Sequence, residues 1–124
     1  MTVYHAYFDG SCKPNPGTMK VWGHINKDGV EIYKFSKEIG PGTNNHSEFL
    51  ALYQLCLGLT KLEIKEATIF GDSQLVVKIM LGKSKGKANR LLNVKHAILK
   101  LWCKKWKLEH VPRKMNMRAN RLSH

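Results

Sequence analysis

Three acidic residues stand at positions that ordinary solvation of a protein surface does not explain. Asp9 comes at the end of an apolar segment, residues 3–9, and Asp72 follows a second, shorter apolar segment. Glu48 lies in the first turns of the most apolar helical stretch. Adjacent strands lie about 4.8 Å apart, so the two aspartates can converge if their strands are neighbours. A helix packed across that edge of the sheet can bring Glu48 to the same point.

Converging carboxylates repel one another and tend to protonate unless a cation neutralises them. Hard oxygen ligands, with no His or Cys set at zinc spacing, favour Mg²⁺ or Mn²⁺. Two such ions, about 3.5–4 Å apart, can activate a water molecule and stabilise the leaving oxygen of a phosphodiester. Each residue also has an ordinary explanation: Asp9 as a turn starter, Glu48 as a first-turn acid favoured by the helix dipole, and Asp72 as a helix N-cap. Spacing alone leaves these alternatives open.

The elements that position Asp9 are expected in the first third of the chain. Residues 3–9 are rich in aromatic and β-branched side chains and predict a strand, which residues 10–17, dense in turn formers, should end. Residues 21–26 and 31–38 flank an Asp-Gly pair, which predicts a hairpin. Three antiparallel strands are therefore expected, followed by a loop over residues 40–45.

The rest of the chain alternates predicted helices with short predicted strands. Helices are expected at residues 46–62, 73–81, 90–105 and 116–122, strands at 67–70 and 108–111, and a basic surface loop at 82–89. Asn44 or Asn45 is expected to cap the first helix. Right-handed crossovers would make the later strands parallel. We therefore expect one domain, residues 1–124, with an α/β (in some schemes α+β) fold: a mixed five-stranded sheet, three strands antiparallel and two parallel, flanked by helices.

The net charge points to a polyanionic partner. Lys and Arg number 21 against 9 Asp and Glu, giving a formal charge of +12. Nucleic acid is the expected partner, an anionic membrane is less favoured, and the alternative is a surplus that serves solubility. The three cysteines are scattered, which disfavours a zinc site or a disulfide framework. We see no signal peptide and no apolar run long enough to span a bilayer, so we expect a soluble, cytoplasmic protein.

Four segments, in order along the chain, resemble the type 1 ribonuclease H family. They read FDGSCKPNPG at residues 8–17, TNNHSEFLAL at 43–52, FGDSQLV at 70–76 and HVPRKMNMRANRLS at 110–123. The resemblance implies a ribonuclease H-like fold that hydrolyses the RNA strand of RNA·DNA hybrids with two Mg²⁺ or Mn²⁺ ions. We expect a monomer.

The resemblance also implies roles for single residues. Asp9, Glu48 and Asp72 match the metal-binding carboxylates, with Asp9 bridging the two ions. Small polar groups and backbone read the groove and 2′-hydroxyls of a hybrid, and an Asn side chain can donate and accept at once. The residues expected to contact the nucleic acid are Gly10, Ser11, Cys12, Asn15, Thr43, Asn44, Asn45, Gln74, Lys87, Asn89 and Arg90.

The chain departs from the family pattern at its fourth acidic position. The family places a carboxylate after Ala119, where this chain has Asn120. An amide oxygen can ligate a cation but carries no negative charge, so weaker metal binding is expected. A solvent-facing residue misplaced by the alignment is the alternative. His110 lies near the place of a mobile family histidine, and we assign it no role.

The long basic handle of many family members is replaced by residues 82–89. A second basic segment, in which Lys104, Lys105 and Lys107 alternate with Trp102 and Trp106, can extend the grip on nucleic acid or form a solvated helix face over core tryptophans. Three rival functions remain: a hybrid-binding protein with little or no cleavage, a DNA-acting nuclease of the same superfamily, and a basic nucleic-acid-binding module.

Overall fold

A mixed five-stranded sheet in the order β3-β2-β1-β4-β5 forms the centre of the protein. The computed structural model describes residues 2–82 and 89–116. Strands β1 (Tyr4–Cys12), β2 (Gly17–Lys27) and β3 (Val30–Gly42) are antiparallel neighbours. Strands β4 (Glu66–Gly71) and β5 (Lys105–His110) extend the sheet in parallel from β1. The predicted mixed sheet of three antiparallel and two parallel strands is confirmed.

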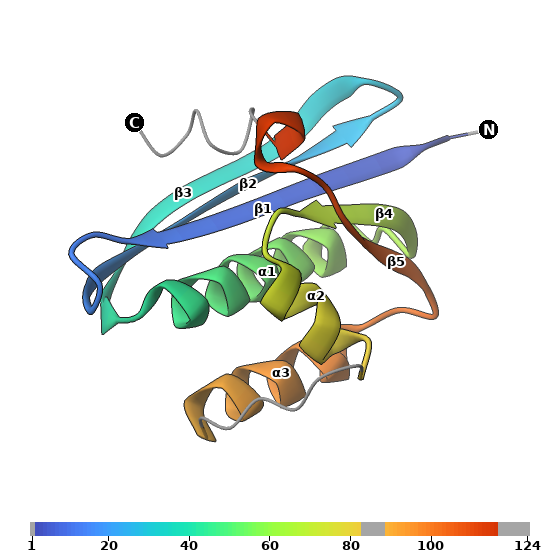
Figure 1. Cartoon of the computed structure of the whole chain (residues 1–124). Helices are drawn as coiled ribbons and strands as arrows, with labels where there is room; N and C mark the ends of the chain where they lie inside the picture. The colour runs from blue at the N-terminus through green and yellow to red at the C-terminus, as the bar shows by residue number, and fades with distance from the viewer. Residues whose placement is uncertain (1, 83–88, 117–124) are drawn as a thin grey trace.

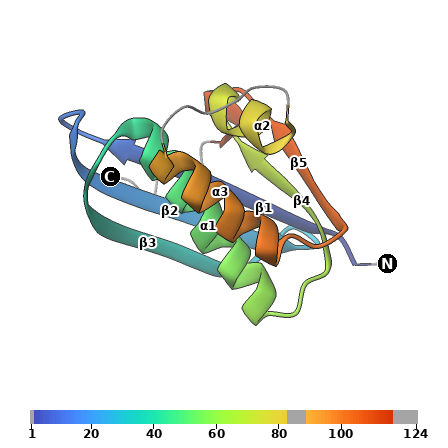
Figure 2. The same ribbon diagram turned by 90° about the horizontal axis from the view of Figure 1, so that it is seen from below.

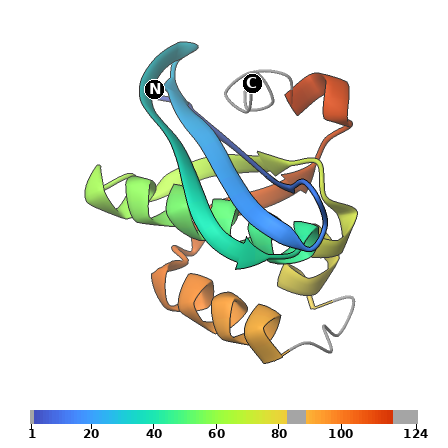
Figure 3. The same cartoon turned by 90° about the vertical axis from the view of Figure 1, so that its left-hand side faces the viewer.

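The α-helices of the described part lie on one side of the sheet (Figures 1 and 2). Helix α1 (Asn44–Lys61) packs on β1 and β2, and α3 (Asn89–Leu101) packs on α1. Helix α2 (Gln74–Met80) contacts α1 and β5. The short 3₁₀ helix η1 (Arg113–Asn116) lies on the opposite side of the sheet and contacts β1, as Figure 3 shows. No helix in the described ranges is long and apolar enough to cross a membrane.

The hydrophobic core lies between the sheet and α1. Phe8 and Ile25 from the strands, and Phe49, Leu52 and Leu55 from the helix, have no exposed surface. Full burial of one such side chain contributes about 1.5–3 kcal/mol. The nearly continuous apolar character of α1, which is covered by the sheet on one side and by α3 on another, is therefore explained.

Strand β1 is longer than predicted, and this changes the setting of Asp9. Residues 10–12 continue the strand because Gly10, Ser11 and Cys12 pair with Val21, Lys20 and Met19 of β2. The turn itself is confined to residues 13–16, between β1 and β2. Cross-strand pairing has overridden local turn preference, so the prediction that Asp9 ends the strand is wrong. The hairpin turn at Asp28-Gly29 is confirmed, and both residues have positive φ, at 50° and 84°.

The helix starts also differ from the predictions. Thr43, not Asn44 or Asn45, caps α1: its Oγ1 accepts a hydrogen bond from His46 N at 3.2 Å. The expected loop is mostly β3, which runs to Gly42 and leaves Thr43 as the extended residue that a cap requires. Ser73, and not Asp72, caps α2 by accepting from Val76 N at 3.3 Å.

The third helix ends four residues earlier than its apolar stripe suggested. Helix α3 stops at Leu101, and Lys105, predicted helical, begins β5. Trp106 pairs with Ala67 of β4 and is buried, which favours a strand. Of the predicted final helix, residues 116–122, the structure describes only Asn116, as the last residue of η1, and residues 117–122 lie outside the described residues.

Candidate metal centre

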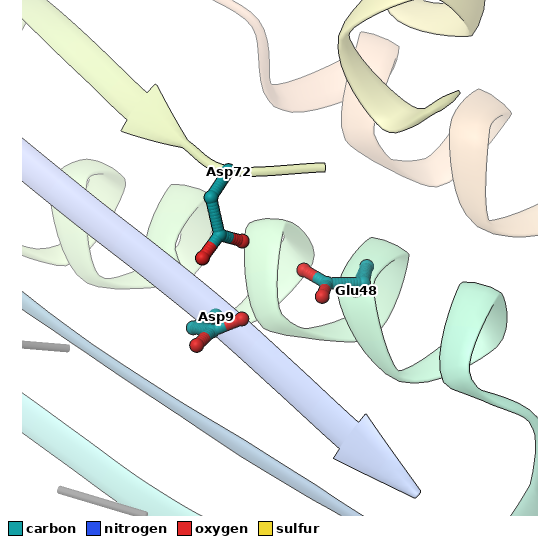
Figure 4. Close-up of side chains that lie close together, drawn as sticks. All are labelled: Asp9, Glu48 and Asp72. Carbon is teal, nitrogen blue, oxygen red and sulfur yellow. The ribbon is translucent and has the colours of Figure 1, made fainter. Parts of the chain in front are cut away.

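Asp9, Glu48 and Asp72 converge at one edge of the sheet (Figure 4). Each offers a carboxylate oxygen, and these oxygen atoms all lie within 4.8 Å of one another. Asp9 comes from β1, Glu48 from α1, and Asp72 from the residue directly after β4. The predicted cluster is therefore present as a geometric arrangement.

The parallel pairing of β1 and β4 explains why the two aspartates meet. The last paired residues are Tyr7 and Phe70, and each aspartate lies two residues further along its strand direction. Gly71 allows the two strands to pack closely, because a Cβ atom there would overlap the ring of Phe8. Register and side-chain size together place Asp9 next to Asp72.

Gly10 explains how the helix approaches the same point. A Cβ atom on Gly10 would lie 2.8 Å from the backbone nitrogen of Glu48 and would overlap the carbonyl group of Ser47. Any larger residue must push α1 away from β1. The glycine that follows Asp9 therefore allows Glu48 to reach the aspartates.

The ordinary explanations for the three carboxylates do not hold in this structure. Asp9 lies inside β1 and starts no turn. Ser73 caps α2 in place of Asp72. The first turn of α1 contains no acidic residue, so Glu48 lies beyond the turn where the helix dipole acts most strongly. None of the three positions is accounted for by local structure.

Two of the carboxylate oxygens are buried and lack hydrogen-bond partners. Asp9 is only 2% exposed, and its Oδ1 accepts a hydrogen bond from Gly10 N at 2.9 Å. Within the described residues, no partner reaches Asp9 Oδ2 or Glu48 Oε2. An unsatisfied buried acceptor costs roughly 1–3 kcal/mol, and more when it is charged. Oxygens left in this condition fit a bound cation.

The electrostatics of the metal-free cluster agree with that reading. Burial, followed by the charge of Asp72, raises the pKa of Asp9 to about 7. The smaller opposing effects are a hydrogen bond with the Glu48 carboxyl, which can form only when one of the two groups carries a proton, then the Gly10 N–H and the charge of Arg113. Burial also raises the pKa of Glu48, and the charges of Asp9 and Asp72 raise it further. A divalent ion would remove this penalty by favouring the charged forms. The residues present therefore suit a hard cation.

The carboxylates line an open cavity of about 270 Å³. Four of the residues predicted to contact nucleic acid share this lining: Gly10, Ser11, Asn44 and Asn45. Four others do not line it: Cys12, Asn15, Thr43 and Gln74. Gln74 instead borders a neighbouring hollow with His110, on the exposed side of α2.

Two asparagines tie the end of β1 and the link that follows it to the start of α1. Asn44 Oδ1 accepts from Cys12 N at 2.7 Å, and Asn15 Oδ1 accepts from Asn44 N at 3.2 Å. Each amide oxygen therefore accepts a hydrogen bond within the protein, and each NH₂ group can still donate to a ligand. The side chain of Cys12 is buried, which limits any contact from this residue to its backbone.

Some predicted residues cannot be placed. Lys87 and Asn120 lie outside the described residues, and for Asn89 and Arg90 only the backbone, at the start of α3, is described. Their roles stay predictions.

Four residues at the site were missed from the sequence. Lys13, Ser73 and Arg113 line the cavity. Asn116 is buried and donates from Nδ2 to Phe8 O at 3.0 Å, which fastens η1 beside Asp9. Arg113 and Asn116 could have been predicted from the fourth family-like segment, which contains the family's V-P-R sequence and the Asn that follows it. Lys13 carried no signal beyond its place in the turn.

Comparison with known proteins agrees with this geometry. A family model described as RNase H matches residues 1–122. The chain is 34% identical over 122 residues to Ribonuclease HI of Halobacterium salinarum, covering 96% of this chain and 61% of that protein. It thus spans less than two thirds of that relative's length.

Solved structures are also similar over nearly the whole chain. RNase H1 of Halobacterium salinarum superposes with a TM-score of 0.92 at 32% identity, covering 96% of this chain and 92% of that one. The N-terminal RNase H domain of a Mycobacterium tuberculosis protein gives 0.92 at 29% identity, covering 98% and 91%. LC11-RNase H1 in complex with an RNA/DNA hybrid gives 0.89 at 28% identity, covering 96% and 92%. Sequence match and shared fold agree: the chain belongs to the RNase H family.

Proposed function

We propose that this chain is an endoribonuclease that hydrolyses the RNA strand of RNA·DNA hybrids with divalent metal ions held by Asp9, Glu48 and Asp72. The observation that carries the proposal is the convergence of these carboxylates, with two buried oxygens left without a partner among the described residues. Membership of the RNase H family and similarity to an RNase H1 that was solved with an RNA/DNA hybrid support it.

The carboxylates would hold two ions, with Mg²⁺ favoured and Mn²⁺ as a substitute, because every donor is a hard oxygen. When bound, such ions supply an activated water and stabilise the charge on the leaving oxygen. The protein keeps Asp9 oriented through the Gly10 N–H and places the positive charge of Arg113 nearby. Asp9, Glu48 and Asp72 would together hold the ions.

The rim of the cavity would distinguish a hybrid from a DNA duplex. Ser11, Asn44 and Asn45 line the cavity beside the carboxylates. Their hydroxyl and amide groups can bond the 2′-hydroxyls and phosphates that a near-A-form groove exposes. Gly10 offers backbone to the same surface, and Thr43, Asn15 and Cys12 would act by holding these groups in place.

Asn120 supports a second candidate, a hybrid-binding protein with little or no cleavage. The amide stands where the family pattern has a fourth carboxylate, so the site would hold one fewer negative charge for its cations. An Asn120→Asp variant is expected to increase metal affinity and cleavage rate. Unchanged activity would mean that Asn120 is not the fourth ligand. The monomeric state, the cytoplasmic location and the single domain stay predictions.

The decisive experiment uses an end-labelled RNA·DNA hybrid with Mg²⁺, with Mn²⁺ and with EDTA. We expect cleavage of the RNA strand only when a divalent ion is present, and none after Asp9→Asn. Glu63→Gln, an exposed acid away from the cavity, is the matched control for charge. A DNA duplex and single-stranded RNA test the rival nuclease activities. Retained cleavage in Asp9→Asn, or a preference for the DNA duplex, would contradict the proposal.

A further inference from the structure

Two cationic side chains line the carboxylate cavity, and they differ in their surroundings. Arg113 belongs to η1, and its charge acts on Asp9. Lys13 is exposed and directly follows β1. Across residues 2–82 and 89–116, no hydrogen bond or ion pair engages the Lys13 ammonium. The cavity therefore has one cation whose charge is directed at the carboxylates and one that is available on the rim.

The backbone on both sides of Lys13 is held in place by Cys12. The buried Sγ of Cys12 lies within hydrogen-bond distance of three carbonyl oxygens, those of Pro14, Gly17 and Gly42, at 3.3, 3.1 and 3.3 Å. These carbonyls belong to the loop itself and to the beginning of β2 and the end of β3. The loop cannot swing away from the sheet without breaking this set of contacts.

The same loop is tied to the start of α1. Cys12 N donates to Asn44 Oδ1 at 2.7 Å, and Asn15 Oδ1 accepts from Asn44 N at 3.2 Å. Lys13 lies between these two attachments, so its Cα is fixed relative to the helix that carries Glu48. Figure 1 shows this loop at one end of the sheet, next to the first turn of α1, while η1 lies over the other side of β1. The two cations that line the cavity therefore come from different elements of the fold.

Lys13 has an anchored backbone and forms no ion pair with the nearby carboxylates among the described residues. Its ammonium group can therefore bind an anionic ligand. The cavity of the proposed enzyme receives a phosphodiester, and the neighbouring phosphates of the same strand must pass its rim. A lysine ammonium is a compact charge that binds phosphate oxygen without demanding one orientation. On the rim, it adds a contact that does not compete with the cations for the carboxylates.

We propose that Lys13 binds a phosphate of the RNA strand next to the scissile one. This inference rests on the proposed hybrid-cleaving function. Lys13 is a substrate-binding residue and takes no part in the bond-breaking step. The contacted group is a non-bridging phosphate oxygen, and no bond is made or broken at the lysine.

Kinetics of Lys13→Gln, Lys13→Arg and Lys65→Gln test this assignment on the full chain. Lys65 is exposed in the link between α1 and β4, and its variant makes the same charge change away from the cavity. Lys13→Gln should raise KM about fivefold with kcat nearly unchanged, and lower the salt dependence of hybrid binding by about one phosphate contact. Lys13→Arg should retain most of the affinity. Equal behaviour of Lys13→Gln and Lys65→Gln would overturn the inference.

A phosphate scan identifies the contact. Single methylphosphonate linkages are placed in turn along the RNA strand, each with a 2′-deoxy sugar for chemical stability, and compared with the same sugar carrying a normal phosphate. A second series places them along the DNA strand. One position beside the cleavage site should weaken the wild type but leave Lys13→Gln unaffected, which is the non-additivity expected of a direct pair. A matching position on the DNA strand, or none, would overturn the assignment.

The two proposals fail in different ways. Wild-type protein that neither cleaves nor binds a hybrid overturns the proposed function, and with it the inference about Lys13. An active wild type with a normal Lys13→Gln variant overturns only the inference. If the wild type binds without cleaving, the same scan is read from Kd in place of KM.

Discussion

Two hollows in the described part of the protein have opposite chemistry. The carboxylate cavity is about 270 Å³ and contains buried oxygens without partners among the described residues. A larger groove of about 530 Å³ lies between α2, α3 and β5 and is lined mainly by apolar side chains, including Trp102 and Trp106. The smaller cavity is the candidate functional site because its buried carboxylate oxygens lack partners. A choice by volume alone would have favoured the apolar groove.

The tryptophans of the groove are satisfied within the protein. Trp106 is 3% exposed, and its Nε1 donates to Ile64 O at 2.9 Å. Trp102 Nε1 donates to Trp106 O at 3.2 Å, and the two rings meet edge to face at 5.6 Å. The sequence left open whether these residues grip nucleic acid, and the structure gives Trp106 a core role. The polar atoms of both tryptophan rings are therefore paired within the protein, whereas Asp9 Oδ2 and Glu48 Oε2 in the carboxylate cavity have no partner among the described residues.

The largest expected effect is that of Asp9→Asn, which should lower activity while it raises stability. Asp9→Asn should lower the cleavage rate by roughly 10³-fold or more, since it removes one of the three carboxylates that would hold the proposed metal ions. The same change should raise the melting temperature in EDTA at pH 8, because it removes a buried charge. Thermal unfolding and hybrid cleavage, measured on one preparation, check the expected rise in melting temperature and the expected fall in cleavage rate. Lower stability together with full activity would contradict our account of the cavity.

The groove should respond in the opposite way. Trp106→Ala should destabilise the protein by about 3–5 kcal/mol through lost burial and an unpaired Ile64 carbonyl. Cleavage per folded molecule should stay close to wild type at low temperature. Urea unfolding and single-turnover cleavage provide the two measurements. Trp106→Phe, which keeps most of the volume, serves as the milder control.

Stability should depend on pH through Asp9 when metal is removed. The pKa of Asp9 is about 7 in the fold, against an ordinary value of 3.8, so the folded state binds more protons between these values. Its contribution to stability is fully present below about pH 4 and is lost as pH rises through about 7, by at most ~4 kcal/mol. Urea unfolding in EDTA from pH 5 to 8 should show this decline. Adding Mg²⁺ in place of EDTA, or the Asp9→Asn change, should reduce this pH dependence. If the free energy of unfolding of Asp9→Asn falls with pH as steeply as that of the wild type, Asp9 is not the group responsible.

The smallest of these effects is expected at Arg113, on the rim of the cavity. Arg113→Gln removes a charge that lowers the pKa of Asp9, so this pKa should rise further. The acidic limb of the pH–rate profile should then move to higher pH, with a loss of about tenfold near neutrality. Arg113→Lys keeps the positive charge, so its acidic limb should lie close to that of the wild type. A uniform loss at every pH would indicate that Arg113 acts through structure alone.

Several local features were predictable because short-range chemistry decides them. The Asp28-Gly29 turn, the apolar helix carrying Glu48 and the alternation of later strands with helices all follow from residue preference and hydrophobic period. Boundaries were predicted less well. Thr43 caps α1 because β3 extends to Gly42, and Lys105 starts β5 because Trp106 pairs with Ala67. Such pairings join residues far apart in sequence, which local preference does not register.

By itself, the sequence determined the order of the elements, the surplus of positive charge and the three carboxylates at consistent places relative to them. Only the tertiary structure decided that the carboxylate oxygens meet, because this depends on the β1–β4 register and on the close contact at Gly10. It also decided that Lys13 and Arg113 share one cavity from opposite parts of the chain. The physical reason is that propensities act over a few residues, whereas a metal centre is defined by distances between side chains that only packing sets.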